Sequence, residues 1–288
     1  MSTGYSPDPS DETLVERATN GDRHALEALV ERHQAWIYNL ALRMVHSPQD
    51  AEDITQEVLL KMVTKLSSFE GRAAFRTWLY RIVKNHVLNM NRRPIERMVT
   101  TFAAYGDQLD AIHDYDPPDE STLPVELHVV VEEAKIGCMM GMLLCLNREQ
   151  RLVYILAELF GVTDRIGSDI MEVTPANFRQ RLSRARRDLH NFMDQKCGLV
   201  RKENPCRCAQ KTKGFIQQGI VDPDNLLFSR GHMKHIREVS ESRSDELEAV
   251  EAEYATLYRD HPFAKGVDSK QLVDTWIRRG ELRAILEL

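Results

Sequence analysis

The sequence predicts an all-α protein: two small helical domains joined by an acidic linker, followed by a mostly helical C-terminal extension. Apolar residues recur at three-and-four spacing along most of the chain, and no segment shows convincing strand alternation. Ser or Thr residues stand just before several of these apolar runs, where helices begin. A length of 288 residues fits two domains, or two domains with a tail.

The composition excludes several classes of protein. Apolar residues make up 42% and charged residues 28%, an ordinary balance for a soluble protein. The longest uncharged apolar run, residues 136–146, is well short of the roughly 20 residues that span a bilayer, so we expect no membrane insertion. The N-terminus lacks the features of a signal peptide, and the 5 cysteines do not suggest a disulfide scaffold. We therefore expect a cytoplasmic protein.

The first domain is expected over residues 11–97, after a loose tail of residues 1–10. Three-and-four spacing predicts a long helix around residues 26–44. Ser47 can cap the next helix, because a Pro in the first turn and an acidic residue soon after are typical of a helix start. A further helix is predicted over residues 74–91. These helices would bury one apolar face each.

A basic and aromatic stretch ends this domain. Between Arg72 and Arg97 there are seven basic residues and one acid, with aromatic residues interleaved at the start. Cations attract nucleic-acid phosphates by counterion release, and aromatic faces stack on unpaired bases at roughly 1–3 kcal/mol each. The helical spacing of Phe75, Trp78 and Ile82 also fits a buried stripe. The basic residues alone fit a solvated face equally well.

An acidic segment separates the two domains. Residues 98–134 contain nine acidic residues and no Lys or Arg, and prolines interrupt the helical pattern, so residues 98–124 are predicted to be a linker. The net charge of −6 seems to argue against nucleic acid. However, much of the acidity lies in this segment, and the basic residues gather in two stripes. An inert, solvated linker is the alternative interpretation.

The second domain is expected over residues 125–195 and contains a helix-turn-helix pattern. Residues 162–173 would form its first helix, and Thr174 is a natural N-cap for the second. Five arginines lie between Arg179 and Arg187, with Asn and Gln near the start of the helix. Amide and guanidinium groups on such a helix read base edges in the major groove. A helix for a protein partner or a membrane surface is the alternative.

Three motifs in this order resemble those of bacterial RNA polymerase sigma factors of the extracytoplasmic-function (ECF) class. The resemblance covers roughly residues 11–195. Residues 50–58 resemble the helix that binds the polymerase clamp, and residues 75–85 resemble the segment that opens and reads the promoter −10 element. Residues 146–151 and the arginine-rich helix resemble the domain that reads the −35 element.

The resemblance implies a transcription initiation factor for a stress or envelope-signal regulon. Its implied partners are core RNA polymerase, promoter DNA and an anti-sigma factor, and no cofactor is required. The acidic linker would thread the polymerase channels, where its charge mimics nucleic acid. The residues implied in polymerase binding are Asp50, Asp53, Gln56 and Glu57. Those implied at the −10 element are Phe69, Arg72, Arg76, Trp78, Arg81, Lys84, Asn85 and Arg92. Those implied at the −35 element are Thr174, Asn177, Arg179, Gln180, Arg181, Arg184 and Arg187.

One short segment departs from the family pattern. Residues 165–168 read Arg-Ile-Gly-Ser, where an acidic pair, Ile and Ala are usual in the family. Gly167 is expected to lower the stability of this helix by roughly 0.5–1 kcal/mol relative to Ala. The departure bears on the strength of −35 binding and not on the class of protein.

Residues 196–288 extend beyond the family core and are predicted to form a regulatory extension that modulates activity. Thiolates and imidazoles are the ligands of structural zinc, so the extension has a zinc candidate of low specificity. Its residues are Cys197, Cys206, Cys208 and His190, with His232 and His235 further downstream. Redox sensing and inert thiols are the alternatives. Cys138 and Cys145, on an apolar helix, are expected in the core.

Two other classes of function explain less of the sequence. A helix-turn-helix repressor or activator, working without core polymerase, would explain residues 162–189 but leaves residues 69–85 and the linker without a role. An enzyme has little support, because no nucleophile–base pair, phosphate loop or carboxylate dyad is visible in the sequence. We therefore expect no catalytic activity.

Overall fold

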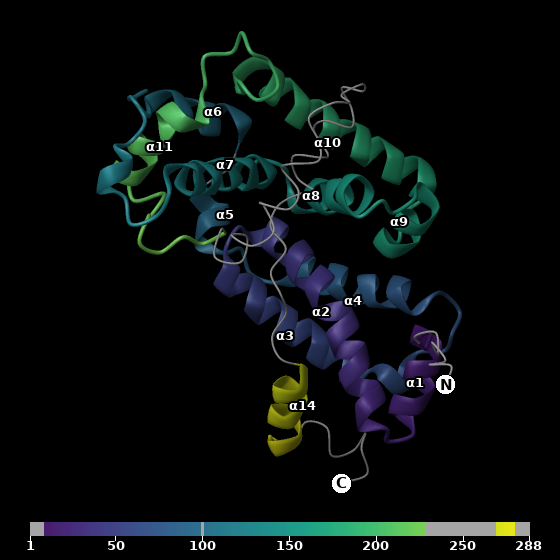
Figure 1. Ribbon diagram of the computed structural model, residues 1–288. Coiled ribbons are helices and arrows are strands. Elements are labelled where there is room, and N and C mark those ends of the chain that lie inside the picture. The colour runs from purple at the N-terminus through teal and green to yellow at the C-terminus, as the bar shows by residue number, and fades with distance from the viewer. Residues whose placement is uncertain (1–8, 99–100, 229–268, 280–288) are drawn as a thin grey trace, which may run out of the picture.

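All of the named secondary-structure elements in the described residues are helices, as Figure 1 shows. The computed structural model describes residues 9–98, 101–228 and 269–279. In these ranges the only strand-like pairing is an isolated parallel bridge between Cys197 and Cys206. No helix in the same ranges is long and apolar enough to cross a membrane. The predicted all-α fold class is confirmed.

The lower group of helices in Figure 1 forms around two long helices that pack on each other. Ser10, Asp22 and Ser47 each accept a hydrogen bond from a backbone N–H in the first turn of the helix that follows, which confirms the cap expected at Ser47. Apolar stripes from all of these helices form one core. The elements are α1 (Asp11–Thr19), α2 (Arg23–Val45), α3 (Pro48–Thr64), η1 (Leu66–Ser68) and α4 (Phe75–Asn89).

The acidic segment is not extended throughout. It contains the helix α6 (Phe102–Ala111), which Thr101 caps by accepting a hydrogen bond from the Ala104 N–H at 3.1 Å. Gly106 and Leu109 of α6 are buried. The expectation of a loose linker is therefore wrong for this helix, because its apolar spacing outweighs its acid content. The short elements nearby are α5 (Pro94–Met98) and η2 (Glu120–Thr122).

The upper group of helices contains the predicted helix-turn-helix (Figure 1). A long apolar helix leads into a short helix that loosens into a π-helical turn, and two further helices follow it. Leu152, Phe178 and Leu189 are among the residues buried between them. The elements are α7 (Leu127–Leu144), α8 (Arg148–Tyr154), η3 (Ile155–Leu159), α9 (Asp164–Met171) and α10 (Pro175–Lys196).

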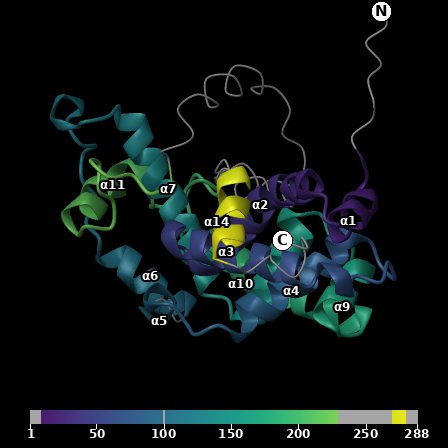
Figure 2. The same ribbon diagram turned by 90° about the horizontal axis from the view of Figure 1, so that it is seen from below.

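The described parts of the extension pack on both groups. Helix α11 (Cys208–Gln217) lies on α7, while α14 (Ser269–Arg278) lies against α2 (Figure 2). Asp274 of α14 forms an ion pair with Arg23 of α2, and Trp276 is buried. Residues 1–8 of the expected tail and residues 229–268 and 280–288 of the expected helical extension, which include His232 and His235, lie outside the described residues.

Candidate nucleic-acid and polymerase interface

Helix α3 presents an acidic and amide face to solvent. Its apolar residues are buried, and this leaves Asp53, Gln56 and Glu57 exposed. Asp50 lies in the first turn, and its Oδ1 is 3.2 Å from Nε of Arg93. Three of the four residues predicted for polymerase binding thus form one accessible surface, and the fourth is partly covered by an ion pair.

An open cavity of about 580 Å³ lies between α3 and the end of α4. Asn85, Asn89 and Asn91 line it together with basic residues. Burial and the neighbouring Lys61 ammonium lower the pKa of His86, although Glu57 acts in the opposite direction. The cavity therefore combines neutral amides, which can read base edges, with cations that suit phosphates.

The aromatic residues before and within α4 pack on one another. The ring centroid of Phe69 is 5.2 Å from that of Phe75 and 5.7 Å from that of Trp78. Phe75 is fully buried, so it belongs to the core, as its spacing allowed. Gly71 has a φ of +68°, which only a turn residue without a Cβ adopts at little cost. This turn leaves Arg72 exposed at the tip of the loop.

The first cation of α4 lies over aromatic rings. The guanidinium carbon of Arg76 is 5.3 Å from the centroid of the Trp36 ring and 5.7 Å from that of Tyr80. Such contacts are typically worth about 0.5–1 kcal/mol at exposed sites. Arg76 remains exposed at the N-terminal end of α4. It is thus held by the rings and still available to a phosphate.

The next two basic residues of α4, Arg81 and Lys84, form ion pairs with the helix-turn-helix. Arg81 forms an ion pair with Asp169, and Nζ of Lys84 lies 2.6 Å from Oε2 of Glu172. Lys84 is only 6% exposed. The hydrogen bond from Lys84 lowers the pKa of the Glu172 carboxyl, so this carboxyl is charged at neutral pH. Two residues predicted for −10 binding are therefore paired with acids of the helix-turn-helix.

Helices α9 and α10 form the helix-turn-helix, and a glycine sets their spacing. Thr163 caps α9, and Thr174 caps α10 by accepting from the Asn177 N–H at 3.2 Å. The fully buried ring of Phe178 lies against Gly167, where a Cβ atom would come within 2.3 Å of it. The departure from the family pattern at Gly167 thus has a packing reason, because it makes room for Phe178.

The outward face of α10 carries most of the residues predicted for −35 contacts. Arg179 forms a 2.5 Å ion pair with Asp164 of α9, and Arg181 forms a 2.7 Å ion pair with Glu149 of α8. These pairs hold the arginines in place, but surface pairs of this kind are weak, about 0–1 kcal/mol. The exposed members of the predicted set are Thr174, Asn177, Arg179, Gln180, Arg184 and Arg187.

A buried ion cluster joins the two helical groups. Glu96 of α5 lies 2.6 Å from Arg148 and 3.0 Å from Arg151, both in α8. Arg151 also donates to the carbonyls of Leu143, at 3.0 Å, and Leu146, at 3.0 Å. Burial raises the pKa of Glu96, but hydrogen bonds from Arg148 and the Arg93 backbone outweigh it and lower the pKa. Sequence reasoning missed this cluster, although Glu96 is the lone acid of a basic stretch.

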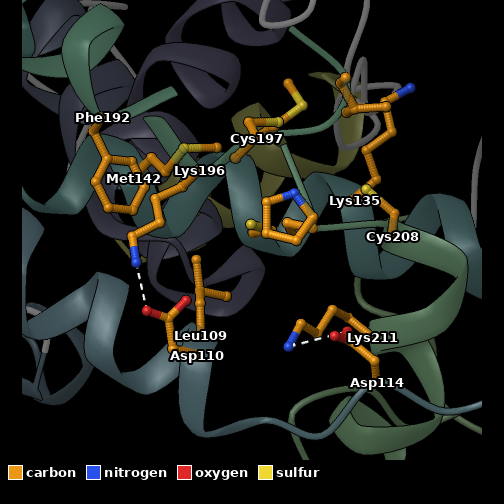
Figure 3. Close-up of a pocket in the computed structure, with 15 residues that line it drawn as sticks. Leu109, Asp110, Asp114, Lys135, Met142, Phe192, Lys196, Cys197, Cys208 and Lys211 are labelled. Atoms are coloured by element: carbon orange, nitrogen blue, oxygen red, sulfur yellow. Dashed lines mark hydrogen bonds and ion pairs between the residues drawn. The ribbon is translucent and has the colours of Figure 1, made fainter. Parts of the chain in front are cut away.

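The cysteines are arranged differently from the predicted zinc candidate. Cys197, Cys206 and Cys208 line one pocket, and the fourth cysteine there is Cys138, which was expected in the core (Figure 3). His190 does not line this pocket and lies near the Tyr154 ring, with centroids 6.4 Å apart. Burial raises the pKa of the Cys208 thiol to about 12 and also raises the pKa of Cys138. These thiols are therefore protonated at neutral pH.

Taken together, the fold and the site define a two-part helical protein that carries a helix-turn-helix with an exposed arginine-rich face and a second, amide-lined basic surface. Residues 29–94 match the family model described as Sigma-70 region 2. Residues 136–189 match the model described as Sigma-70, region 4.

The relatives agree with these matches. The RNA polymerase sigma-H factor of Pseudomonas aeruginosa is 33% identical over 181 residues, which cover 61% of this chain and 90% of the relative. The ECF RNA polymerase sigma-E factor of Haemophilus influenzae is 32% identical over 187 residues, which cover 63% of this chain and 94% of the relative. Among solved structures, CnrH in complex with the cytosolic domain of CnrY covers 65% of this chain and 98% of that chain, at 21% identity and a TM-score of 0.45.

The chain belongs to the ECF sigma factors. It is a promoter-directing subunit of RNA polymerase, and the proteins of this family are initiation factors rather than enzymes.

Proposed function

We propose that the chain works as a cytoplasmic sigma factor with four functional parts. Residues 11–97 bind core polymerase and the −10 element, residues 98–124 form the linker, residues 125–195 bind the −35 element, and residues 196–288 regulate. Both family matches fall inside the ranges assigned to DNA and polymerase. Recognition by hydrogen bonds, stacking and ion pairs needs no cofactor.

Polymerase docking is assigned to the exposed face of α3. Asp53, Gln56 and Glu57 lie there together, while the apolar side of the helix is committed to the core. The −10 element is assigned to the amide-lined cavity at Asn85 and the loop near Arg72, and the −35 element to the exposed face of α10. A stress or envelope-signal regulon and an anti-sigma partner follow from the family.

The single observation that carries the regulatory side of this proposal is the pairing of Lys84 with Glu172 at 2.6 Å. Lys84 cannot hold a promoter phosphate while it is buried against α9. Arg81 also forms an ion pair, with Asp169, although both of these side chains are partly exposed. We infer that the free protein is closed, and that polymerase binding separates the −10 and −35 domains before DNA is bound.

The extension also holds the acidic linker. The ammonium of Lys211 in α11 donates to the Ile112 carbonyl and lies 3.1 Å from Oδ1 of Asp114. The backbone N–H of Tyr115 donates to the Gln210 carbonyl at 3.1 Å. A linker bound in this way is not free to thread a polymerase channel, so we infer that the extension inhibits initiation until the linker is released.

Run-off transcription with core polymerase on genomic promoters tests this function. Lys211→Met keeps the apolar stem but removes the charge that holds the linker, so we expect a higher run-off yield at limiting core. The matched control is Lys202→Met, which removes the same charge from an exposed loop of the extension. An equal yield from both variants would contradict the inhibitory role. Failure of the protein to bind core polymerase in a pull-down would favour the helix-turn-helix regulator instead.

A further inference from the structure

Four of the 5 cysteines of the chain border one pocket of about 150 Å³ (Figure 3). Cys138 comes from the middle of α7, Cys197 directly follows α10, and Cys208 is the first residue of α11. Cys206 completes the group. Three separate segments, from the −35 domain and from the extension, thus bring thiols to the same place.

The loop that carries three of these thiols is tightly built. Cys197 and Cys206 lie opposite each other in the parallel bridge. Nδ2 of Asn204 closes the loop by donating to the carbonyls of Asp194, at 2.9 Å, and Cys197, at 3.0 Å. The chain passes so close to Gly198 that a Cβ there would lie 2.2 Å from the Cys206 carbonyl oxygen. This loop therefore fixes the backbone positions from which the side chains of Cys197, Cys206 and Cys208 extend.

The pocket lining holds both the cations that a thiolate complex needs and acidic partners for them. Lys135, Lys196 and Lys211 line the pocket with the cysteines. A divalent ion held by four thiolates carries two negative charges, and nearby ammonium groups offset them. Each lysine also has an acidic partner close by, so the pocket remains balanced without an ion.

We propose that Cys138, Cys197, Cys206 and Cys208 form an inducible binding site for a thiophilic divalent metal ion such as Zn²⁺. Thiolates are the ligands that such ions select, and four of them satisfy a tetrahedral ion. No three His, Cys, Asp or Glu side chains within the described ranges are grouped tightly enough to hold an ion as they stand. Binding therefore displaces the thiol protons and draws the pocket walls together.

The site differs from the one expected from the sequence and goes beyond the proposed sigma function. Cys138 takes the place of His190, so the ion would tie α7 of the −35 domain to the extension. Because α11 begins at Cys208 and holds the linker through Lys211, the ion would also stabilise that contact between α11 and the linker. The prediction concerns metal affinity, so it can fail while the sigma function stands.

Metal titration of the reduced full-length protein tests the proposal, with Zn²⁺ measured by elemental analysis and Co²⁺ followed by its thiolate charge-transfer absorption. We expect one ion per chain, and protection of four cysteines, but not Cys145, from alkylation when Zn²⁺ is bound. Cys138→Ser and Cys208→Ser should each weaken binding by about tenfold or more, since even the loss of a ligand's hydrogen-bonding partner typically costs that much metal affinity. The matched controls are Cys145→Ser, from the end of the same helix, and His190→Asn, which should bind like the unaltered chain.

The alkylation pattern needs no substitution, so it remains informative if a cysteine variant fails to fold. The proposal is overturned if the reduced protein binds no Zn²⁺, or if Cys138→Ser binds as tightly as Cys145→Ser. Loss of binding in His190→Asn alone would overturn the assignment of Cys138. Recovery of the pocket cysteines as disulfides in protein purified without oxidant would assign the cluster to redox chemistry instead.

Discussion

Lys84 of α4 donates a 2.6 Å hydrogen bond to Glu172, the C-cap residue of α9, across 88 positions of sequence. Lys84 is buried there, and Glu172 ends its helix in a left-handed conformation with a φ of +55°. The two residues belong to the parts of the protein assigned to the −10 and −35 elements. Their hydrogen bond joins these two parts in the closed arrangement, so a substitution at either residue should weaken that arrangement.

Glu172→Gln should open the closed form. It removes the charge that compensates the buried Lys84 ammonium. We expect a loss near the lower end of the about 1.5–3 kcal/mol typical of hydrogen bonds to charged groups, because the Glu172 side chain is 67% exposed. We expect roughly tenfold tighter binding of a single-stranded −10 oligonucleotide by the protein without polymerase, measured by fluorescence anisotropy. Glu203→Gln makes the same charge change in an exposed loop and is the control. Equal gains in both variants would show that only net charge had changed.

Gly167→Ala should destabilise the protein although alanine is the better helix former. The added Cβ would meet the Phe178 ring at 2.3 Å, and overpacking of this kind costs about 1–3 kcal/mol. We expect a lower Tm and weaker −35 binding, measured by thermal unfolding and DNA binding.

The control for this prediction is Gly137→Ala in α7, whose Cβ would lie 3.8 Å from Phe228 in ordinary contact. That variant should be neutral or stabilising, because it gains helix propensity without a clash. Phe178→Leu should rescue Gly167→Ala by making room. A Gly167→Ala protein as stable as Gly137→Ala would contradict the packing role of the glycine.

His46 should make folding stability depend on pH. Its ring stacks on Phe228 of the extension at a centroid distance of 5.5 Å, and burial, with Arg151 nearby, lowers its pKa to about 4. Below an unfolded pKa of about 6.5 the unfolded chain takes up a proton that the folded chain refuses. The contribution of His46 to stability should therefore fall by roughly 2 kcal/mol between pH 7 and pH 5.

Urea unfolding at the two pH values measures this effect. His46→Asn should show a smaller loss of stability between the two pH values, because asparagine does not titrate. Asparagine also tolerates the left-handed conformation that His46 adopts at a φ of +55°. His24→Asn is the control, because the His24 side chain is 88% exposed. The same pH dependence in the His46→Asn and His24→Asn variants would assign the effect to other groups.

Local pattern was enough to predict most helices. The caps at Ser47 and Thr174 were readable because capping depends on a few adjacent residues. Helix α6 was missed because its acid content suggested a linker, whereas the spacing of Phe102, Tyr105 and Leu109 gives it an apolar face.

Long-range pairing was not readable from one sequence. The Glu96 cluster, the Lys84–Glu172 pair and the joining of Cys138 to the extension all depend on how helices pack, and helical periodicity says nothing about which helices meet. The charge of Lys84 predicted a nucleic-acid contact, but only the fold shows that Lys84 is paired with an acid of the other domain.

The most direct test of the closed arrangement is the reactivity of Lys84 toward an amine acylating reagent, measured by mass spectrometry with exposed Lys65 as the internal reference. In the free protein, Lys84 should react much more slowly than Lys65, because it is 6% exposed and bound to Glu172. In complex with core polymerase and without DNA, Lys84 should become reactive as the two domains separate. Equal reactivity of the two lysines in the free protein, or protection of Lys84 that persists in the complex, would contradict the account.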